Sequence, residues 1–135
     1  MTCRNCRVAL ALIVTGFFTP LSPNTRAQSA AADPGTVIVT LHARKGADER
    51  LAQVLVNHWE TARRLNLVLD TPHVTLKGTE TSGDRYFLEI FSWRDASIPD
   101  NAPAAIQAIW GEMNTLVESR GGKRGIEIAE VLHIR

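Results

Sequence analysis

The alternation of apolar and polar positions predicts a strand and then a helix at the start of the folded part of the chain. Residues Thr36 to Ala43 (TVIVTLHA) are β-branched and apolar, which is typical of a buried strand. From Ala47 to about Asn66 the apolar positions recur at intervals of three and four, which predicts an amphipathic helix. The expected buried stripe of this helix comprises Leu51, Val54, Leu55, His58, Ala62 and Leu65.

A β-hairpin is predicted in the middle of the chain. His73 to Thr79, opened by Pro72, and Arg85 to Trp93 are rich in apolar, β-branched and aromatic residues, as strands are. The polar run from Glu80 to Asp84 lies between them and is expected to form the connecting loop.

A second helix follows the hairpin. Asp100 or Asn101 is expected to cap it, and Pro103 suits its first turn because the missing N–H is no loss there. Gly121 and Gly122 are expected to provide a left-handed stop. The expected buried stripe comprises Ile106, Ile109, Trp110, Met113, Leu116 and Val117.

Ile126 to Ile134 is another strand pattern, so the predicted order is β-α-β-β-α-β. Short right-handed connections fold this order into an α+β, ferredoxin-like domain, a four-stranded antiparallel sheet with two helices on one face. Both faces of the sheet need cover, because Leu88 and Ile90 alternate with Phe87 and Phe91 along the third strand. The two helices can cover only one face. We therefore expect a homodimer packed sheet against sheet, which is a dimeric α/β barrel.

The first 31 residues have the features of a cleavable signal peptide followed by a short linker. Arg4 and Arg7 precede an apolar run, Val8 to Phe18, and a polar stretch then ends in small residues. The apolar run has 11 residues, fewer than the roughly 20 that cross a membrane as a helix. We expect cleavage between Gln28 and Ala32, a mature domain over 32–135 with no membrane span, and a periplasmic or secreted location.

Removal of this segment changes the chemistry that the chain can perform. Cys3 and Cys6 lie within it, so their spacing is not evidence for a zinc or redox site. The 15 basic and 14 acidic residues of the whole chain become 12 and 14, because three arginines are lost. The RGGKR run at 120–124 is short and interrupted by glycine, so we expect a solvated turn and no nucleic-acid partner.

Two stretches of the mature domain resemble a known family. They are TVIVTLHARKGADERLAQVL at 36–55 and FLEIFSWRDAS at 87–97, in which a strand ends in Phe91, Trp93 and Asp95 before a helix. This pattern resembles the antibiotic-biosynthesis-monooxygenase-like family of ferredoxin-like dimeric barrels. Members of that family include cofactor-independent oxygenases of polycyclic phenols, haem-degrading enzymes and domains with no assigned activity. The resemblance thus implies a dimer with a pocket for a small, aromatic molecule.

The sequence departs from the haem-degrading members at two of three positions. Their first-strand asparagine would fall near Val39, and their second-helix histidine falls near Ile109 or Trp110. Only their tryptophan is retained, at Trp93. The resemblance therefore implies no haem and no other cofactor, and it gives Trp93 the role of a pocket residue.

Glu89 is the carboxylate in the most apolar strand, where burial would suit a proton acceptor or donor. The alternative is a structural pair with Lys77, His73 or another basic group, and such pairs are the commoner case. Glu89 and Trp93 are four residues apart, so they point to the same side of the sheet. If that side faces the helices, both would line one cavity with His58; otherwise they would pack in a dimer interface.

The histidines of the mature domain are His42, His58, His73 and His133, and no two have the spacing of a metal site. We therefore expect no bound metal. His42 and His58 could each line a cavity between the sheet and the helices. A core or rim histidine with satisfied hydrogen bonds is the commoner situation for each.

Three tryptophans offer stacking surface for a flat aromatic ligand. Trp93 is the best candidate because it lies at a strand end, whereas Trp110, on the buried helical stripe, is more often plain core. Trp59 is the third.

The sequence is consistent with two functions. One is a small-molecule-binding dimeric barrel that acts as a cofactor-independent monooxygenase on an aromatic or quinol-type substrate. The other is a non-catalytic, exported ligand-binding or structural dimer of the same fold. Hydrolases and nucleotide-binding proteins are disfavoured, because the chain has no GxSxG, GxxxxGK[ST] or GxGxxG motif.

Overall fold

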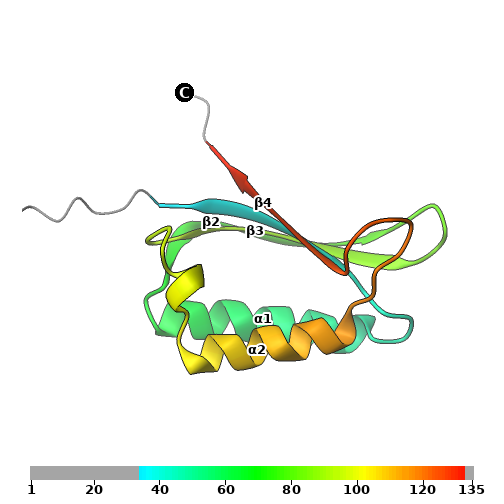
Figure 1. Ribbon diagram of the computed structural model, residues 1–135, viewed down its shortest axis with the longest axis horizontal. Helices are drawn as coiled ribbons and strands as arrows, with labels where there is room; N and C mark the ends of the chain where they lie inside the picture. The colour runs from blue at the N-terminus through cyan, green and yellow to red at the C-terminus, as the bar shows by residue number, and fades with distance from the viewer. Residues whose placement is uncertain (1–33, 133–135) are drawn as a thin grey trace, which may run out of the picture.

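The computed structural model describes residues 34–132 and shows a sheet covered on one face by two helices (Figure 1). The predicted α+β, ferredoxin-like fold is confirmed. The elements in chain order are β1 (Thr36–His42), α1 (Asp48–Arg64), β2 (Val68–Thr79), β3 (Arg85–Trp93), the short 3₁₀ helix η1 (Pro99–Asn101), α2 (Ala104–Leu116) and β4 (Ile126–Val131).

The sheet is antiparallel with the strand order β2-β3-β1-β4. Strands β1 and β3 are central, and Val39 of β1 lies opposite Glu89 of β3. On the other side of β3, Thr75 of the edge strand β2 lies opposite the same glutamate. Glu89 is thus in the middle of the sheet, with a strand on either side.

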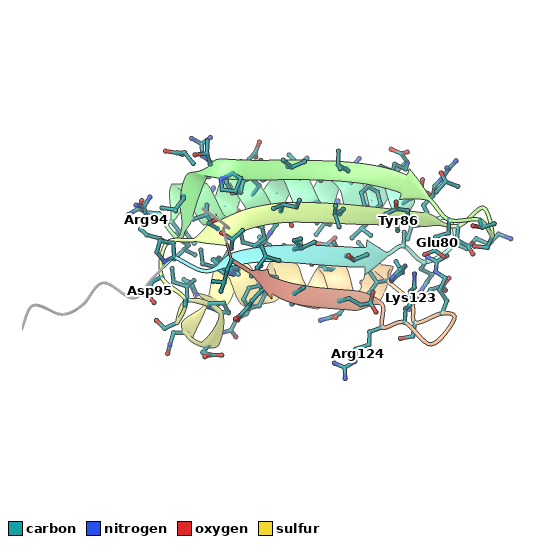
Figure 2. The ribbon with its side chains drawn as sticks, turned by 90° about the horizontal axis from the view of Figure 1, so that it is seen from above. Glu80, Tyr86, Arg94, Asp95, Lys123 and Arg124 are labelled. Carbon is teal, nitrogen blue, oxygen red and sulfur yellow. The ribbon has the colours of Figure 1, made fainter. Side chains whose placement is uncertain are left out.

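Alternate side chains of each strand point to opposite faces of the sheet. Leu41 of β1 and Phe87 of β3 are neighbours in register and are buried beneath the helices. The other face, which we call the open face, is seen in Figure 2. It carries Ile38 and His42 from β1, and Ile90 from β3.

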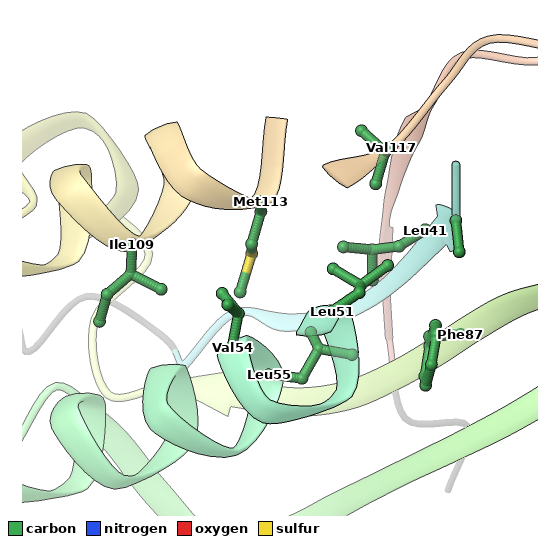
Figure 3. Close-up of a cluster of buried hydrophobic side chains, with 9 residues drawn as sticks. Leu41, Leu51, Val54, Leu55, Phe87, Ile109, Met113 and Val117 are labelled. Atoms are coloured by element: carbon green, nitrogen blue, oxygen red, sulfur yellow. The ribbon is translucent and has the colours of Figure 1, made fainter. Parts of the chain in front are cut away.

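The core consists of two apolar clusters between the sheet and the helices. One includes Leu41, Leu51, Leu55, Phe87 and Met113 and is shown in Figure 3. The other includes Val37, Ala62, Val68, Phe91, Trp93 and Ile106. Glu89 lies on β3 between Phe87 of the first cluster and Phe91 of the second, so a carboxylate interrupts the apolar core.

The second strand is longer than its sequence pattern indicates. It begins at Val68 instead of His73, and its pairing with β3 is irregular between these two residues. Pro72 lies within the irregular stretch, where its missing N–H costs no regular ladder bond. An edge strand with such an irregularity accommodates proline, and for this reason the expected strand start was wrong.

The ends of the second helix also differ from expectation. Asp100 and Asn101 do not cap α2, because they lie in η1, and Pro103 directly precedes the first helical residue. Gly121 and Gly122 have the expected positive φ values, but α2 has already ended at Leu116. The two glycines instead form the tight turn that joins Arg120 to Lys123.

Arg120 is not the solvated residue that its glycine-rich run predicts. Its guanidinium donates to the backbone carbonyl oxygens of Ala43 at 2.6 Å and Arg85 at 3.1 Å, and it forms an ion pair with Asp84 at 3.1 Å. Its side chain is only 16% exposed. Arg120 therefore fastens the segment before β4 to the end of the β2–β3 hairpin, whereas Lys123 is exposed as expected.

The expected signal peptide, with Cys3 and Cys6, lies outside the described residues, and so does His133. Within residues 34–132, no helix has the length and hydropathy needed to cross a membrane. The stripe of α1 is as expected except at its end: Leu65 is 39% exposed, and Thr61 is buried in its place.

Candidate functional site between sheet and helices

Glu89 and His58 lie side by side beneath the helices. Glu89 is 1% exposed and His58 is 3% exposed. Oε2 of Glu89 is 3.5 Å from Nδ1 of His58, which α1 directs toward the sheet. This separation is longer than a good hydrogen bond, and Nδ1 has no other partner. The two residues form a buried acid–base pair whose facing atoms lie just beyond hydrogen-bond distance.

The other ring nitrogen of His58 is bonded to Trp110. The indole N–H of Trp110 donates to Nε2 of His58 at 3.2 Å. An indole nitrogen can only donate, so Nε2 must be the unprotonated, accepting nitrogen of the imidazole. We infer from this hydrogen bond that the proton of the neutral ring is on Nδ1, facing Glu89. Three of the predicted site residues thus form one chain.

His73 approaches the carboxylate from the other side. Its Nε2 is 3.8 Å from Oε1 of Glu89, and its ring is stacked on Trp59 with centroids 3.6 Å apart and planes 2° apart. Burial lowers the pKa of His73 below the 6.5 of an unperturbed imidazole, and the charge of Glu89 opposes that shift. Because the first effect is larger, His73 is mainly neutral at pH 7.

The alternative prediction for Glu89 was a structural pair with Lys77, His73 or another basic group. The structure places His58 and His73 beside the carboxylate. Lys77 binds Asp48 at 2.8 Å and Glu49 at 3.1 Å instead. The partners of Glu89 are therefore two groups that are neutral when unprotonated, and no permanently charged base lies against it.

Aromatic rings surround this acid–base pair. Phe91 and Trp93 meet the imidazole of His58 edge-on, with ring centroids 5.7 Å and 6.3 Å away. Trp93 also meets Trp110 edge-on at 6.2 Å. Trp93 is 5% exposed, so it is packed in the core and not at an open strand end as its position in the sequence suggested.

His42 does not belong to this site, contrary to one expectation. It lies on the open face and not between the sheet and the helices, because it shares the parity of Ile38 and Thr40 and not that of Leu41. Its Nδ1 is 2.7 Å from Oε1 of Glu80, and its Nε2 is 3.4 Å from Oε2 of Glu127. His42 is thus a buried histidine with both nitrogens paired.

A hollow of about 650 Å³ opens on the open face beside His42. Glu80, Tyr86 and Lys123, which Figure 2 labels at one end of the sheet, belong to its lining. Sequence reasoning did not single out these three residues. The antiparallel register provided a signal, because it pairs Tyr86 with His42. The remaining lining residues are Thr40, His42, Thr79, Thr81 and Ser82.

A second hollow of about 140 Å³ lies near the turn between β1 and α1. Glu89, His58, Trp93 and Trp110 line neither hollow. Among residues 34–132, no group of three or more histidine, cysteine, aspartate or glutamate side chains is placed to bind a metal ion. The buried acid–base pair therefore lies in a packed region of the domain.

Solved structures share this fold. No family model and no curated protein matches the chain. An antibiotic biosynthesis monooxygenase is 14% identical, with a TM-score of 0.55 over 75% of this chain and 99% of its own. SnoaB, a cofactor-independent oxygenase from Streptomyces nogalater, is 12% identical, with a TM-score of 0.54 over 77% of this chain and 96% of its own. PA3566 from Pseudomonas aeruginosa is 18% identical, with a TM-score of 0.55 over 78% of this chain and 98% of its own.

These similarities define the class of fold. The chain has the ferredoxin-like fold of the antibiotic-biosynthesis-monooxygenase-like proteins, as its sequence pattern predicted. At this level of identity the similarity establishes the fold and not the activity.

Proposed function

We propose that this chain is an exported, homodimeric barrel that binds an aromatic or quinol-type molecule beside Glu89 and oxygenates it without a cofactor. One observation carries the proposal: a carboxylate that is 1% exposed lies between two imidazoles and under a wall of aromatic rings. Buried titratable groups in aromatic surroundings are typical of small-ligand sites. That some proteins of this fold bear the names of oxygenases supports the choice of reaction.

The proposed role of Glu89 is to accept the proton of a substrate hydroxyl. The resulting phenolate is electron-rich and can give electrons to O₂ directly. One oxygen atom enters the ring as a carbonyl, and the other leaves as water with the hydroxyl and ring hydrogens, so the substrate supplies all the electrons. His58, with its Nδ1 proton directed at Glu89, would keep the carboxylate oriented.

A ligand would have to enter by displacing an aromatic side chain, because the rings around Glu89 are packed. Trp59, His73 and Trp110 are the partly exposed members of this group. Trp59 and His73 form the outer stack, and His73 is on the edge strand β2. A flat ligand could take the place of one of these rings and keep the same stacking contacts.

The proposed dimer would cover the open face. Val74 is 40% exposed and Leu76 is 53% exposed on this face, and Ile38, Leu88 and Ile90 extend the apolar surface across the sheet. A second copy is the occupant that the fold favours, because sheet-to-sheet packing buries the same surface on both partners.

The proposed export rests on the signal-like segment that precedes the domain. Intact-mass measurement of the protein recovered outside the cytoplasm tests it. A mature protein that begins between Gln28 and Ala32 is the expected result. Recovery of a species that still carries Val8 to Phe18 would contradict it.

A second function is favoured by a different observation. Glu89 and Trp93 are fully packed, and the larger hollow lies on the open face at His42. This arrangement suits a non-catalytic ligand-binding or structural dimer that keeps the barrel without the chemistry. It is the alternative against which the enzyme proposal is tested.

Oxygen uptake with a panel of hydroxylated aromatics separates the two functions. The enzyme proposal expects turnover without added flavin or metal, a loss of about a hundredfold in Glu89→Gln because the proton acceptor is removed, and weaker substrate binding in Trp93→Ala. Glu60→Gln, an exposed carboxylate of α1, is the matched control and should change nothing. Binding without turnover would favour the non-catalytic dimer, and unchanged turnover in Glu89→Gln would exclude Glu89 as the acceptor.

A further inference from the structure

A buried proton acceptor is useful only if it can exchange its proton with solvent. The groups that face Glu89 come from each element packed against it. From β1 the register places Val39 opposite it, and from β2 it places Thr75. The titratable groups within 4.0 Å are His58 from α1 and His73 from β2. A proton that leaves Glu89 through a side chain therefore has two candidate routes.

The route through His58 is closed by Trp110. To pass a proton onward, an imidazole must take it on one nitrogen and release it from the other. Nε2 of His58 accepts the indole N–H of Trp110 at 3.2 Å, so this nitrogen cannot release a proton while the bond exists. Because Nε2 accepts this hydrogen bond, the ring proton is on Nδ1, and Nδ1 cannot take up a second one from Glu89. His58 can orient Glu89 but cannot relay its proton.

The route through His73 is not closed in this way. Its Nε2 lies 3.3 Å from Oγ1 of Thr75, and a hydroxyl, unlike an indole N–H, can accept a hydrogen bond as well as donate one. The side chain of His73 is 25% exposed, whereas that of Glu89 is 2% exposed, so His73 connects the carboxylate to the surface. Burial keeps the pKa of His73 low, and the positive charge of Arg63 also lowers it, while Glu89 opposes both. His73 is therefore mainly neutral near pH 7 and can take up a proton. The stack on Trp59 fixes the plane of its ring.

We propose that Glu89 exchanges its proton with solvent through His73, and that Trp110 is the positioning residue that closes the route through His58. The proposal rests on the proposed role of Glu89 as a proton acceptor. In the outward step, Oε1 of Glu89 and Nε2 of neutral His73, which are 3.8 Å apart at rest, come within hydrogen-bond distance and the proton passes to Nε2. The imidazolium then releases its Nδ1 proton to water. Glu89 is left as a carboxylate, and His73 is neutral again.

The test for His73 follows the infrared band of the protonated Glu89 carboxyl group after a pH jump, in the purified protein without substrate. The band is assigned by its loss in Glu89→Gln. Exchange through His73 predicts that His73→Ala slows the response by about a hundredfold and that imidazole added to the solution restores it. Thr71→Val, an exposed threonine of the same strand, is the matched control and should respond like the parent protein.

Three results would overturn this route. The first is an unchanged response in His73→Ala, and the second is a Glu89 that stays ionised at every pH at which the protein is folded. The third is a slower response in His73→Ala that added imidazole does not restore, because this would indicate a structural role. None of these results depends on oxygenation, so failure of the relay can be distinguished from failure of the proposed function.

The test for Trp110 is the ¹⁵N spectrum of the histidine rings. In the parent protein His58 should carry its proton on Nδ1, with slow exchange against deuterium. In Trp110→Phe, Nε2 is released, so exchange of the His58 ring proton should become at least about tenfold faster. If Nε2 carries the proton in the parent protein, the closed route is refuted without any variant.

Discussion

The imidazole of His42 joins the hairpin loop to the far edge of the sheet through two carboxylates. Its Nδ1 is 2.7 Å from Oε1 of Glu80, and its Nε2 is 3.4 Å from Oε2 of Glu127 on β4. His42 is 2% exposed although it is on the open face, because these neighbours cover it. Only a protonated imidazole can donate to both carboxylates at once.

Replacement of His42 should weaken the fold through this link. We expect His42→Ala to lower the free energy of unfolding by about 2 kcal/mol, because a short, charge-assisted hydrogen bond is lost and Glu80 is left beside a void. Glu127→Gln is the control: its contact is longer and its side chain is 43% exposed, so a change of about 0.5 kcal/mol or less is expected. Urea unfolding measures both, and equal effects of the two variants would contradict the stronger role of Glu80.

Two glycines should respond to alanine in opposite directions. Gly111 lies in α2 with no atom within 4 Å of an added Cβ, so Gly111→Ala should stabilise the protein by about 0.5–1 kcal/mol. An added Cβ at Gly125 would lie 2.9 Å from Val117 and 3.2 Å from the backbone of Glu118. Backbone cannot move aside cheaply, so Gly125→Ala should cost about 1–3 kcal/mol. Thermal unfolding of the two variants and the parent protein measures both effects. Destabilisation by Gly111→Ala would show that α2 is not packed as described.

The fold follows from local patterns that act together. The period of three and four in α1, the hairpin between Thr79 and Arg85, and the short connections leave few other topologies. Local patterns could not locate the first part of β2, from Val68 to Pro72, because a proline in the sequence normally indicates the start of a strand. The edge position that makes this proline acceptable is a property of the whole sheet.

The site was predicted less completely than the fold. The helix-facing side of β3 could not be chosen, since Phe87 and Phe91 are no more apolar than Leu88 and Ile90; the structure shows that Glu89 and Trp93 face the helices. For β1 the sequence did contain the answer. Leu41 belongs to the wholly apolar set with Val37 and Val39, so the alternation of β1 turns His42 away from the helices.

Acid should destabilise the protein in two steps. Burial lowers the folded-state pKa of His73 below 6.5, so the unfolded chain takes up this proton first as the pH falls. The resulting stability is present above pH 6.5 and is lost as the pH falls from there toward the folded-state pKa. Lys77 lowers the pKa of Asp48, and the N–H and hydroxyl of Ser97 lower that of Asp95, so their contributions are lost below about pH 4.

His73→Gln separates these two steps. It should remove the loss that begins near pH 6.5 and leave the loss below about pH 4, when unfolding by urea is measured over a series of pH values. A profile that is the same in both proteins above pH 5 would mean that burial of His73 has no energetic consequence.

Disruption of the apolar open face should separate the proposed dimer without unfolding the chain. Ile90 lies in the middle of this face on the central strand β3, opposite Ile38 of β1, so Ile90→Asp would place a charge between two packed sheets. Val56→Asp is the matched control, because Val56 is on α1 and is 58% exposed. Light scattering should give twice the chain mass for the parent protein and for Val56→Asp, and the single chain mass for Ile90→Asp. Circular dichroism checks that all three are folded. A parent protein that is a stable monomer at micromolar concentration would exclude the dimeric barrel, since its apolar open face would then need no partner.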